Sequence, residues 1–304
     1  MRRIFACVVA LLLCVFVLQA ETNETYVRCI AFYNLENLFD TIHDEGKNDY
    51  EYLPDGGMKW TKFKYDHKIQ NMAYAIAQLG TDEDPRGAAC VGVSEVENIG
   101  CLHDLCKELR EKHNRIYEPI LLEGPDRRGV DVGFLYNPAM FKPVFTKGYE
   151  LHAHYADGGV VRSRLQLWVS GYMLDDDRKI VRDKIHISVN HWPSRYGGEE
   201  SSRATRDTAA MLCKQVCDSI YLKEPRAKII VMGDLNDDPF NHSCAVVMGA
   251  KKTREEVGEQ GFFNTMWQKL DRGIGSLAYQ GSWNLFDQIF ISEPLMNAQL
   301  EEGK

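Results

Sequence analysis

Apolar and polar positions along this chain alternate in two patterns, one typical of strands and one of helices. Short runs rich in apolar and β-branched residues predict strands. Apolar residues spaced three and four apart predict helices. The strands are expected over residues 26–34, 88–94, 130–136, 165–174, 184–190, 228–232 and 288–292.

Three segments have the helical spacing. The first begins near Lys62 and ends at Gly80, a residue that commonly terminates helices. The second surrounds Leu102–Leu109, and the third covers 203–221. A polar, irregular stretch over 46–57 predicts a surface loop. The lysines Lys62, Lys64 and Lys68 are expected on a solvated helix face.

The order of these elements indicates one α+β domain over residues 21–304, with layered sheets flanked by helices. Two early β-α units lead into two strands joined by the acidic turn 175–177, and then into another helix and strand. The chain contains no linker, repeat or low-complexity segment. Its 304 residues, 44% of them hydrophobic, are enough to bury a sizeable core.

The first 20 residues are predicted to be a secretory signal peptide rather than part of the fold. Arg2 and Arg3 precede an almost wholly apolar run over 4–18, which ends in the small residue Ala20. The alternative is a transmembrane anchor, which the shortness of the run disfavours. We therefore expect a secreted or periplasmic protein.

Charge and cysteine content make two classes of function less plausible, binding of polyanions over a broad surface and zinc chemistry. Two of the 36 basic residues lie in the leader, so the mature chain has 34 basic and 44 acidic residues, a net charge near −10. This argues against a broad polyanion-binding surface but leaves a local cationic pocket possible. Seven cysteines follow the leader without a Cys-x-x-Cys pair, so zinc chemistry is not indicated. Most are expected in the core, and a Cys101–Cys106 disulfide stays open.

The apolar run 228–232 is followed by Gly233, Asp234, Leu235 and Asn236. Residues two apart in an extended segment point the same way, so Asp234 and Asn236 can converge on one ligand. Their oxygen atoms suit a hard cation such as Mg²⁺, and the amide can also hold a phosphoryl oxygen. The alternative is a simple turn, because Asp, Asn and Pro are common turn residues.

Similar polar clusters lie at the ends of other predicted strands, at 34–36, 95–98, His191 and Asp287. Carboxylates can hold a cation, amides can position a phosphoryl group, and an imidazole can transfer a proton near neutral pH. Each cluster alone also has a structural explanation, such as a helix cap or a packed loop residue. Together they predict metal-assisted phosphate chemistry.

In order along the chain, these motifs resemble the endonuclease/exonuclease/phosphatase superfamily, in a secreted bacterial branch. The matching segments are 32–37, 94–98, 128–134, 190–195, 233–236 and 286–289. The resemblance implies a four-layered α/β/β/α sandwich of two mixed sheets. It also implies catalytic roles for His191, Asp234, Asn236 and Asp287, phosphate contacts for Asn34, Arg162 and Arg195, and a metal site at Glu95 and Asn34.

The family's final Ser-Asp-His motif is absent from the sequence, and no His follows His242. We therefore expect a C-terminally incomplete domain that lacks its last strand, with an open sheet edge beside Asp287.

The resulting hypothesis is a secreted, Mg²⁺- or Mn²⁺-dependent phosphodiesterase or nuclease-type hydrolase. Its substrate would be a nucleic acid, a phospholipid head group or a small phosphate ester. The alternative is a non-catalytic or impaired binding protein on the same scaffold, because the final motif is absent. No feature indicates an obligate protein partner, and we expect a monomer.

Overall fold

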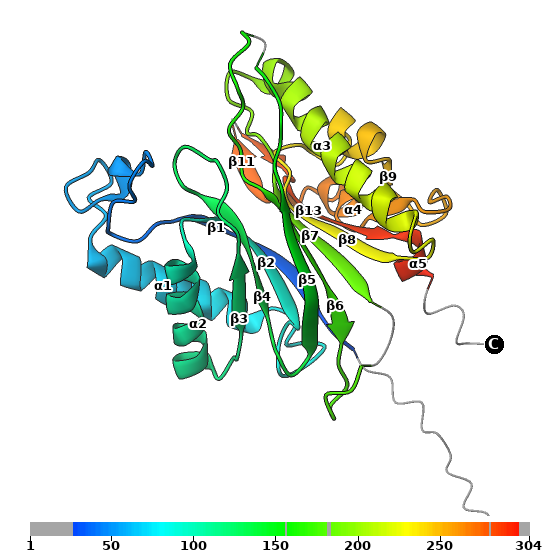
Figure 1. Ribbon diagram of the computed structural model, residues 1–304, viewed down its shortest axis with the longest axis horizontal. Helices are drawn as coiled ribbons and strands as arrows, with labels where there is room; N and C mark the ends of the chain where they lie inside the picture. The colour runs from blue at the N-terminus through cyan, green and yellow to red at the C-terminus, as the bar shows by residue number, and fades with distance from the viewer. Residues whose placement is uncertain (1–26, 156, 181–183, 280, 298–304) are drawn as a thin grey trace, which may run out of the picture.

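The computed structural model describes residues 27–155, 157–180, 184–279 and 281–297, which form two facing sheets between helices (Figure 1). Helices α1 (Lys62–Gln78) and α2 (Ile99–His113) cover the outer face of the smaller sheet. Helix α3 (Glu199–Tyr221) covers the outer face of the larger one. This confirms the four-layered sandwich. The signal-peptide prediction falls on residues outside those described.

The smaller sheet has the order β1-β2-β4-β3. Its strands are β1 (Ile30–Leu38), β2 (Cys90–Val96), β3 (Glu118–Leu121) and β4 (Asp131–Tyr136). Only β1 and β2 run parallel, so their carboxyl ends meet at one edge of the sheet. Helix α1 makes the crossover between these two strands, which parallel pairing requires.

The larger sheet has the order β5-β6-β7-β8-β13-β10-β9. Its strands are β5 (Phe141–Tyr149), β6 (Gln166–Met173), β7 (Ile185–His191), β8 (Lys228–Asp234), β9 (Ala250–Lys251), β10 (Phe262–Asn264) and β13 (Asp287–Ser292). Strand β13 lies between β8 and β10 and pairs with both. The expectation of an open sheet edge is therefore wrong for residues 290–292 of β13, which pair with β10, a segment that the apolar pattern did not identify. Among the described strands, Asp287 itself is paired with β8 alone.

The remaining elements are short. They are a 3-10 turn (Tyr50–Tyr52), a π-helical turn (Ser243–Val247), α4 (Trp267–Asp271), the hairpin β11 (Leu277–Tyr279) and β12 (Ser282–Asn284), and α5 (Glu293–Met296). All seven strands and three helices expected from the sequence are present, with shifted ends. Helix α3 begins four residues early because Glu199 and Glu200 already occupy its first turn, where acidic side chains are favourable.

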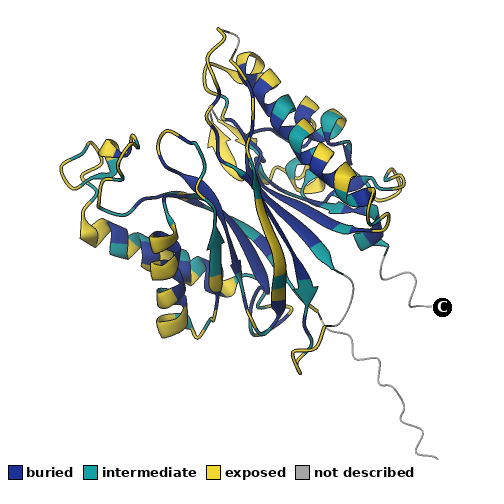
Figure 2. Ribbon diagram, viewed as in Figure 1, coloured by how far each residue is buried: buried dark blue, intermediate teal, exposed yellow. Residues whose placement is uncertain are grey.

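Three apolar clusters hold the layers together (Figure 2). One lies between the sheets and includes Phe134, Val189 and Met232, while the other two lie beneath the helices. Strands β2 and β8 face apolar groups on both sides, which explains their nearly continuous apolar sequence. Both sheets are thereby fixed rigidly at the ends that carry the polar clusters.

The seven described cysteines are all free, and six of them are buried. Cys101 and Cys106 both lie on the apolar face of α2, so the disulfide left open by the sequence does not form. They serve instead as small core residues, as expected for most of the set. Within the described ranges, no helix has the length and apolar character needed to cross a membrane.

Candidate active site

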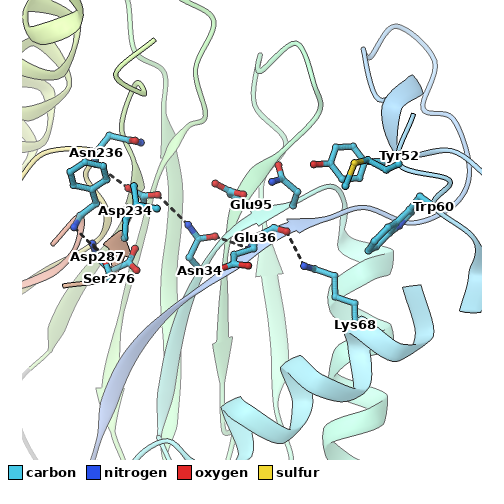
Figure 3. A pocket seen from close by; sticks show the side chains of 14 residues that line it. Asn34, Glu36, Tyr52, Trp60, Lys68, Glu95, Asp234, Asn236, Ser276 and Asp287 are labelled. Carbon is cyan, nitrogen blue, oxygen red and sulfur yellow. Dashed lines mark hydrogen bonds between the residues drawn. The ribbon is translucent and has the colours of Figure 1, made fainter. Parts of the chain in front are cut away.

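A pocket of about 500 Å³ opens between the two sheets at their polar strand ends (Figure 3). Carboxylates and amides occupy its centre, and aromatic and apolar groups line its flanks. The lining residues are Asn34, Glu36, Asn37, Tyr52, Met58, Trp60, Lys68, Glu95, Asp234, Asn236, Ser276, Leu277, Phe286 and Asp287.

Strand register in the larger sheet sets three of the site residues side by side. His191 on β7 is directly opposite Asp234 on β8, and Asp234 is directly opposite Asp287 on β13. Laterally paired residues point to the same face of a sheet. All three therefore face the smaller sheet. Gly233 permits this alignment, because a Cβ atom there would lie 2.0 Å from the carbonyl oxygen of Asn190.

Glu95 reaches the same point from the smaller sheet through an irregularity in β2. Its φ of 61° is in the left-handed region, and the pairing of β2 with β4 shifts register between Ser94 and Val96. Such a bulge changes the direction in which a side chain points. Non-glycine residues with positive φ cluster at this edge, since Glu36, Asn37 and Asn236 have it too. Backbone strain of this kind is common at functional sites.

Glu95, His191 and Asp234 bring three ligand atoms within 4.8 Å of one another. The Nε2 atom of His191 lies 3.9 Å from an oxygen of Glu95 and 3.7 Å from an oxygen of Asp234. One imidazole nitrogen and two carboxylates at this separation can hold a divalent cation. The metal site predicted at Glu95 thus gains two further candidate ligands.

Asn34 and Asn236 hold Asp234 in place. Asn34 donates from Nδ2 to Asp234 Oδ2 at 3.1 Å, while its own Oδ1 accepts the Glu36 amide N–H at 2.8 Å. Asp234 Oδ1 accepts the backbone N–H of Asn236 at 3.0 Å. Asn236 in turn donates from Nδ2 to the Trp192 carbonyl at 3.0 Å. Asn34 therefore supports the carboxylate most directly, whereas the sequence suggested contacts with metal and phosphate.

The electrostatics of the site favour binding of a cation. Burial, followed by the charge of Glu95, raises the pKa of Asp234 to about 6. Burial and the charge of Asp234 raise the pKa of Asp287 to about 7. Burial and the nearby Arg164 and Arg128 hold the pKa of His191 well below its usual value, so its imidazole is neutral.

Four carboxyl groups line this pocket, and Lys68 is the only basic side chain among the described lining residues. The negative charge of a phosphate ester would be repelled by the carboxylates that line the pocket, which belong to Glu36, Glu95, Asp234 and Asp287. A divalent cation held by the Glu95, His191 and Asp234 atoms would reverse that repulsion. The residues present therefore fit the divalent metal that the sequence predicts.

Two predicted phosphate contacts lie elsewhere. Arg162 lines a separate cavity, beside Lys47 and Arg127. The Arg195 guanidinium contacts Asp237 at 3.4 Å and Asp238 at 3.2 Å, and does not line the pocket. Motif position alone predicts both arginines at the site, and it carries no information on where their side chains point. Ion pairing with buried carboxylates makes Arg195 a support for the loop after β8, and its Nε donates to the carbonyl of Asn236 at 2.9 Å.

Two further residues at the site were not predicted from the sequence. Arg164 is buried beneath it, donating to the Trp192 carbonyl at 2.9 Å and to Asp126 at 3.3 Å. Lys68, expected on a solvated helix face, lines the pocket and donates to the carbonyl of Glu36 at 2.9 Å. Lys68 lies one helical turn after Lys64, and this spacing does not predict which of the two lines the pocket. That depends on how α1 packs against the sheet.

Aromatic residues from the loop before α1 form one flank of the pocket. Tyr52 stacks on Phe39 with ring centroids 4.2 Å apart, and the Trp60 ring meets Tyr52 edge-on at 6.0 Å. The Trp60 indole donates to the carbonyl of Phe39 at 2.8 Å. These contacts fix the rings without closing the pocket (Figure 3). The opposite flank is Ser276, Leu277 and Phe286, at and beside the hairpin β11–β12.

Comparisons with known proteins agree with this architecture. Residues 29–303 match the model of the Endonuclease/Exonuclease/phosphatase family. The fold is similar to that of a mannosyl-6-phosphatase of Bacteroides thetaiotaomicron VPI-5482, at 16% identity over 87% of this chain and 85% of that chain, with a TM-score of 0.50. It is also similar to an endonuclease/exonuclease/phosphatase of Bacteroides vulgatus, at 13% identity over 86% and 85%, with a TM-score of 0.50. A search of curated proteins by sequence found no match.

Proposed function

Because the chain belongs to the endonuclease/exonuclease/phosphatase family, we propose that it hydrolyses phosphate esters with the help of a divalent metal ion. One observation carries the proposal: ligand atoms of Glu95, His191 and Asp234 converge at a pocket whose lining holds four carboxyl groups and one lysine. Mg²⁺ is the metal we favour and Mn²⁺ the substitute, since carboxylate oxygens dominate the ligand set. When bound, the ion would neutralise charge on the phosphoryl group and lower the pKa of a coordinated water.

The protein's own groups would then divide the work. Asp234, oriented by Asn34 and Asn236, accepts the proton of the attacking water. The neutral imidazole of His191 would hold the ion through Nε2, together with Glu95. Asp287 carries a proton for part of the time near neutral pH and can pass it to the leaving oxygen. This gives each carboxyl group a distinct role.

The flanks of the pocket would select the organic part of the substrate. Trp60 and Tyr52 offer ring faces and edges on which a base or a sugar can pack. The fold similarity to a mannosyl-6-phosphatase makes a sugar monoester a second substrate worth assaying. A nucleotide ester fits the same flank, so the two classes are compared directly in the test.

The test is hydrolysis by the purified mature chain of bis-p-nitrophenyl phosphate, p-nitrophenyl phosphate and mannose 6-phosphate, with EDTA, Mg²⁺ or Mn²⁺. We expect metal-dependent turnover that Glu95→Gln reduces about 10²-fold or more. Glu111→Gln, on the exposed end of α2, is the matched control and should leave the rate unchanged. Calorimetry should show metal binding that Glu95→Gln weakens.

Metal binding without turnover of any substrate would contradict catalysis and favour the non-catalytic alternative. Turnover insensitive to both EDTA and Glu95→Gln would contradict the metal site.

Export by residues 1–20 is a further part of the proposal, supported by the positively charged and apolar leader. N-terminal sequencing of the protein from a bacterial secretion host should find a start near Glu21. Recovery of an intact leader in the membrane fraction would favour an anchor instead.

A further inference from the structure

A second cavity, of about 460 Å³, is lined by residues that the proposed reaction does not use. It is formed by the segment 46–48 of the first long loop, by 125–127 of the loop between β3 and β4, and by Arg162. The loop between β3 and β4 rises at the same edge of the sheets as the active-site pocket (Figure 1).

The charge of this cavity is opposite to that of the whole chain. Lys47, Arg127 and Arg162 line it, in a protein whose net charge is −8. The guanidinium groups of Arg127 and Arg162 have no hydrogen-bond or ion-pair partner among the described residues. The one carboxylate in the lining, Asp126, lies 3.3 Å from Arg164 and 3.8 Å from Arg128. Its charge is therefore compensated from outside the cavity.

Hydrogen bonds link residues at and beside the cavity to residues that line the active-site pocket. Arg128, next to Arg127, donates to Asn37 Oδ1 at 3.3 Å, and Asn37 lines the pocket. Asp126 is joined to the pocket through Arg164, which shares the carbonyl of Trp192 with Asn236. These contacts make the cavity and the pocket neighbours on one surface of the protein.

We propose that the cavity binds a second phosphoryl group of a substrate whose scissile ester occupies the active-site pocket. Two guanidinium groups without partners offer paired N–H donors that match phosphate oxygens, and Lys47 adds a point charge. The substrate class is thus an ester with at least two phosphates, such as an oligonucleotide, rather than a simple monophosphate. This inference rests on the proposed hydrolase function.

The test uses two chromogenic esters that differ by one phosphate: thymidine 5′-(p-nitrophenyl phosphate) with and without a 3′-phosphate. With the mature chain and Mg²⁺ or Mn²⁺, we expect kcat/KM about tenfold higher for the 3′-phosphorylated ester. The double variant Arg127→Gln/Arg162→Gln should bring that ratio near one. Arg110→Gln/Lys223→Gln removes the same charge at exposed sites on α2 and after α3, and should keep the wild-type ratio.

A wild-type ratio near one would overturn the inference and leave the hydrolase function intact. An equal fall of the ratio in both double variants would overturn it too, because net charge alone would then explain the preference. If neither ester is hydrolysed, the proposed function fails, and calorimetry with thymidine 3′,5′-bisphosphate and thymidine 5′-phosphate decides the binding question. The proposed phosphate site is supported if the wild type binds the bisphosphate more tightly than the monophosphate and Arg127→Gln/Arg162→Gln loses this difference. Equal affinities of the wild type for the two nucleotides overturn it.

Discussion

The strand ends and the loops around the pocket contribute different chemistry. The strand ends supply His191, Asp234 and Asp287, which are fixed by register, and Glu95, which a bulge in β2 directs to the same point. The loops supply the aromatic rings of Tyr52 and Trp60, which lie at the pocket's open flank, and the exposed cations Arg127 and Arg162. Bond making requires atoms held within fractions of an ångström, which a sheet provides. Substrate selection requires surface, which loops provide.

This contrast predicts that changes at strand ends act on catalysis or folding and that changes in loops act on substrate binding. The largest effect is expected for Asp234→Asn, which removes the proton-accepting carboxylate and a candidate metal ligand. We expect kcat to fall by about 10²–10⁴. Thermal unfolding should show that the variant is folded. Asp218→Asn, exposed on α3, is the control. A KM effect with unchanged kcat would contradict the assigned role.

The next effect concerns stability. Gly233→Ala would place a methyl group 2.0 Å from the Asn190 carbonyl, at a φ of 152°. We expect a loss of about 3 kcal/mol in the free energy of unfolding, because β7 and β8 must separate. Urea denaturation measures it. Gly258→Ala, in a loop with nothing within 4 Å, should be nearly neutral. Equal stabilities for both variants would mean that strand contact at 233 is unimportant.

A smaller effect is expected on the loop side. Trp60→Ala removes a ring from the pocket flank, and we expect KM to rise about tenfold while kcat changes little. Steady-state kinetics on the best substrate found for the wild type would measure this split. Trp60→Phe keeps an aromatic face and should recover part of the affinity. A large fall in kcat for both variants would mean that the loop contributes to the chemical step, which would contradict the contrast between strand ends and loops.

The last effect is the pH dependence due to Glu97, a strand-end carboxyl that does not line the pocket. Burial raises its pKa to about 8, with Asp40, Asp44 and Asp49 adding repulsion. The folded state therefore keeps a proton that the unfolded chain releases above about pH 4.3. Stability from this group falls as the pH rises from about 4 to 8 and is constant above that.

Glu97→Gln cannot release a proton, so it should gain stability relative to the wild type between pH 5 and pH 8. Each kcal/mol corresponds to about 2–4 °C in Tm for a chain of this size. EDTA should be present, because Asp40, Glu97 and Cys101 lie close enough to hold a metal. Parallel Tm curves for the two proteins would show that the carboxyl is already ionised in the fold.

The principal strands and helices could be predicted from the sequence because their side-chain periodicity is a local property. The apolar run 228–232 and the helical spacing after Lys62 both gave elements close to those observed. Short pairings such as β10 with β13 gave no such pattern. The partner of a strand depends on contacts far along the chain, so an open edge was expected where β10 in fact pairs.

The central site residues were likewise predicted from the sequence, since carboxylates, amides and an imidazole at strand ends have few purely structural uses together. Only the tertiary structure decided their arrangement: Asn34 supports Asp234, Arg195 binds Asp237 and Asp238, and Arg162 faces a separate cavity. Arg164 and Lys68 lie at the site because the strands and α1 pack in the observed orientation. Residue type fixes what a group can do, but a long flexible side chain acquires its partner only when the fold places one within reach.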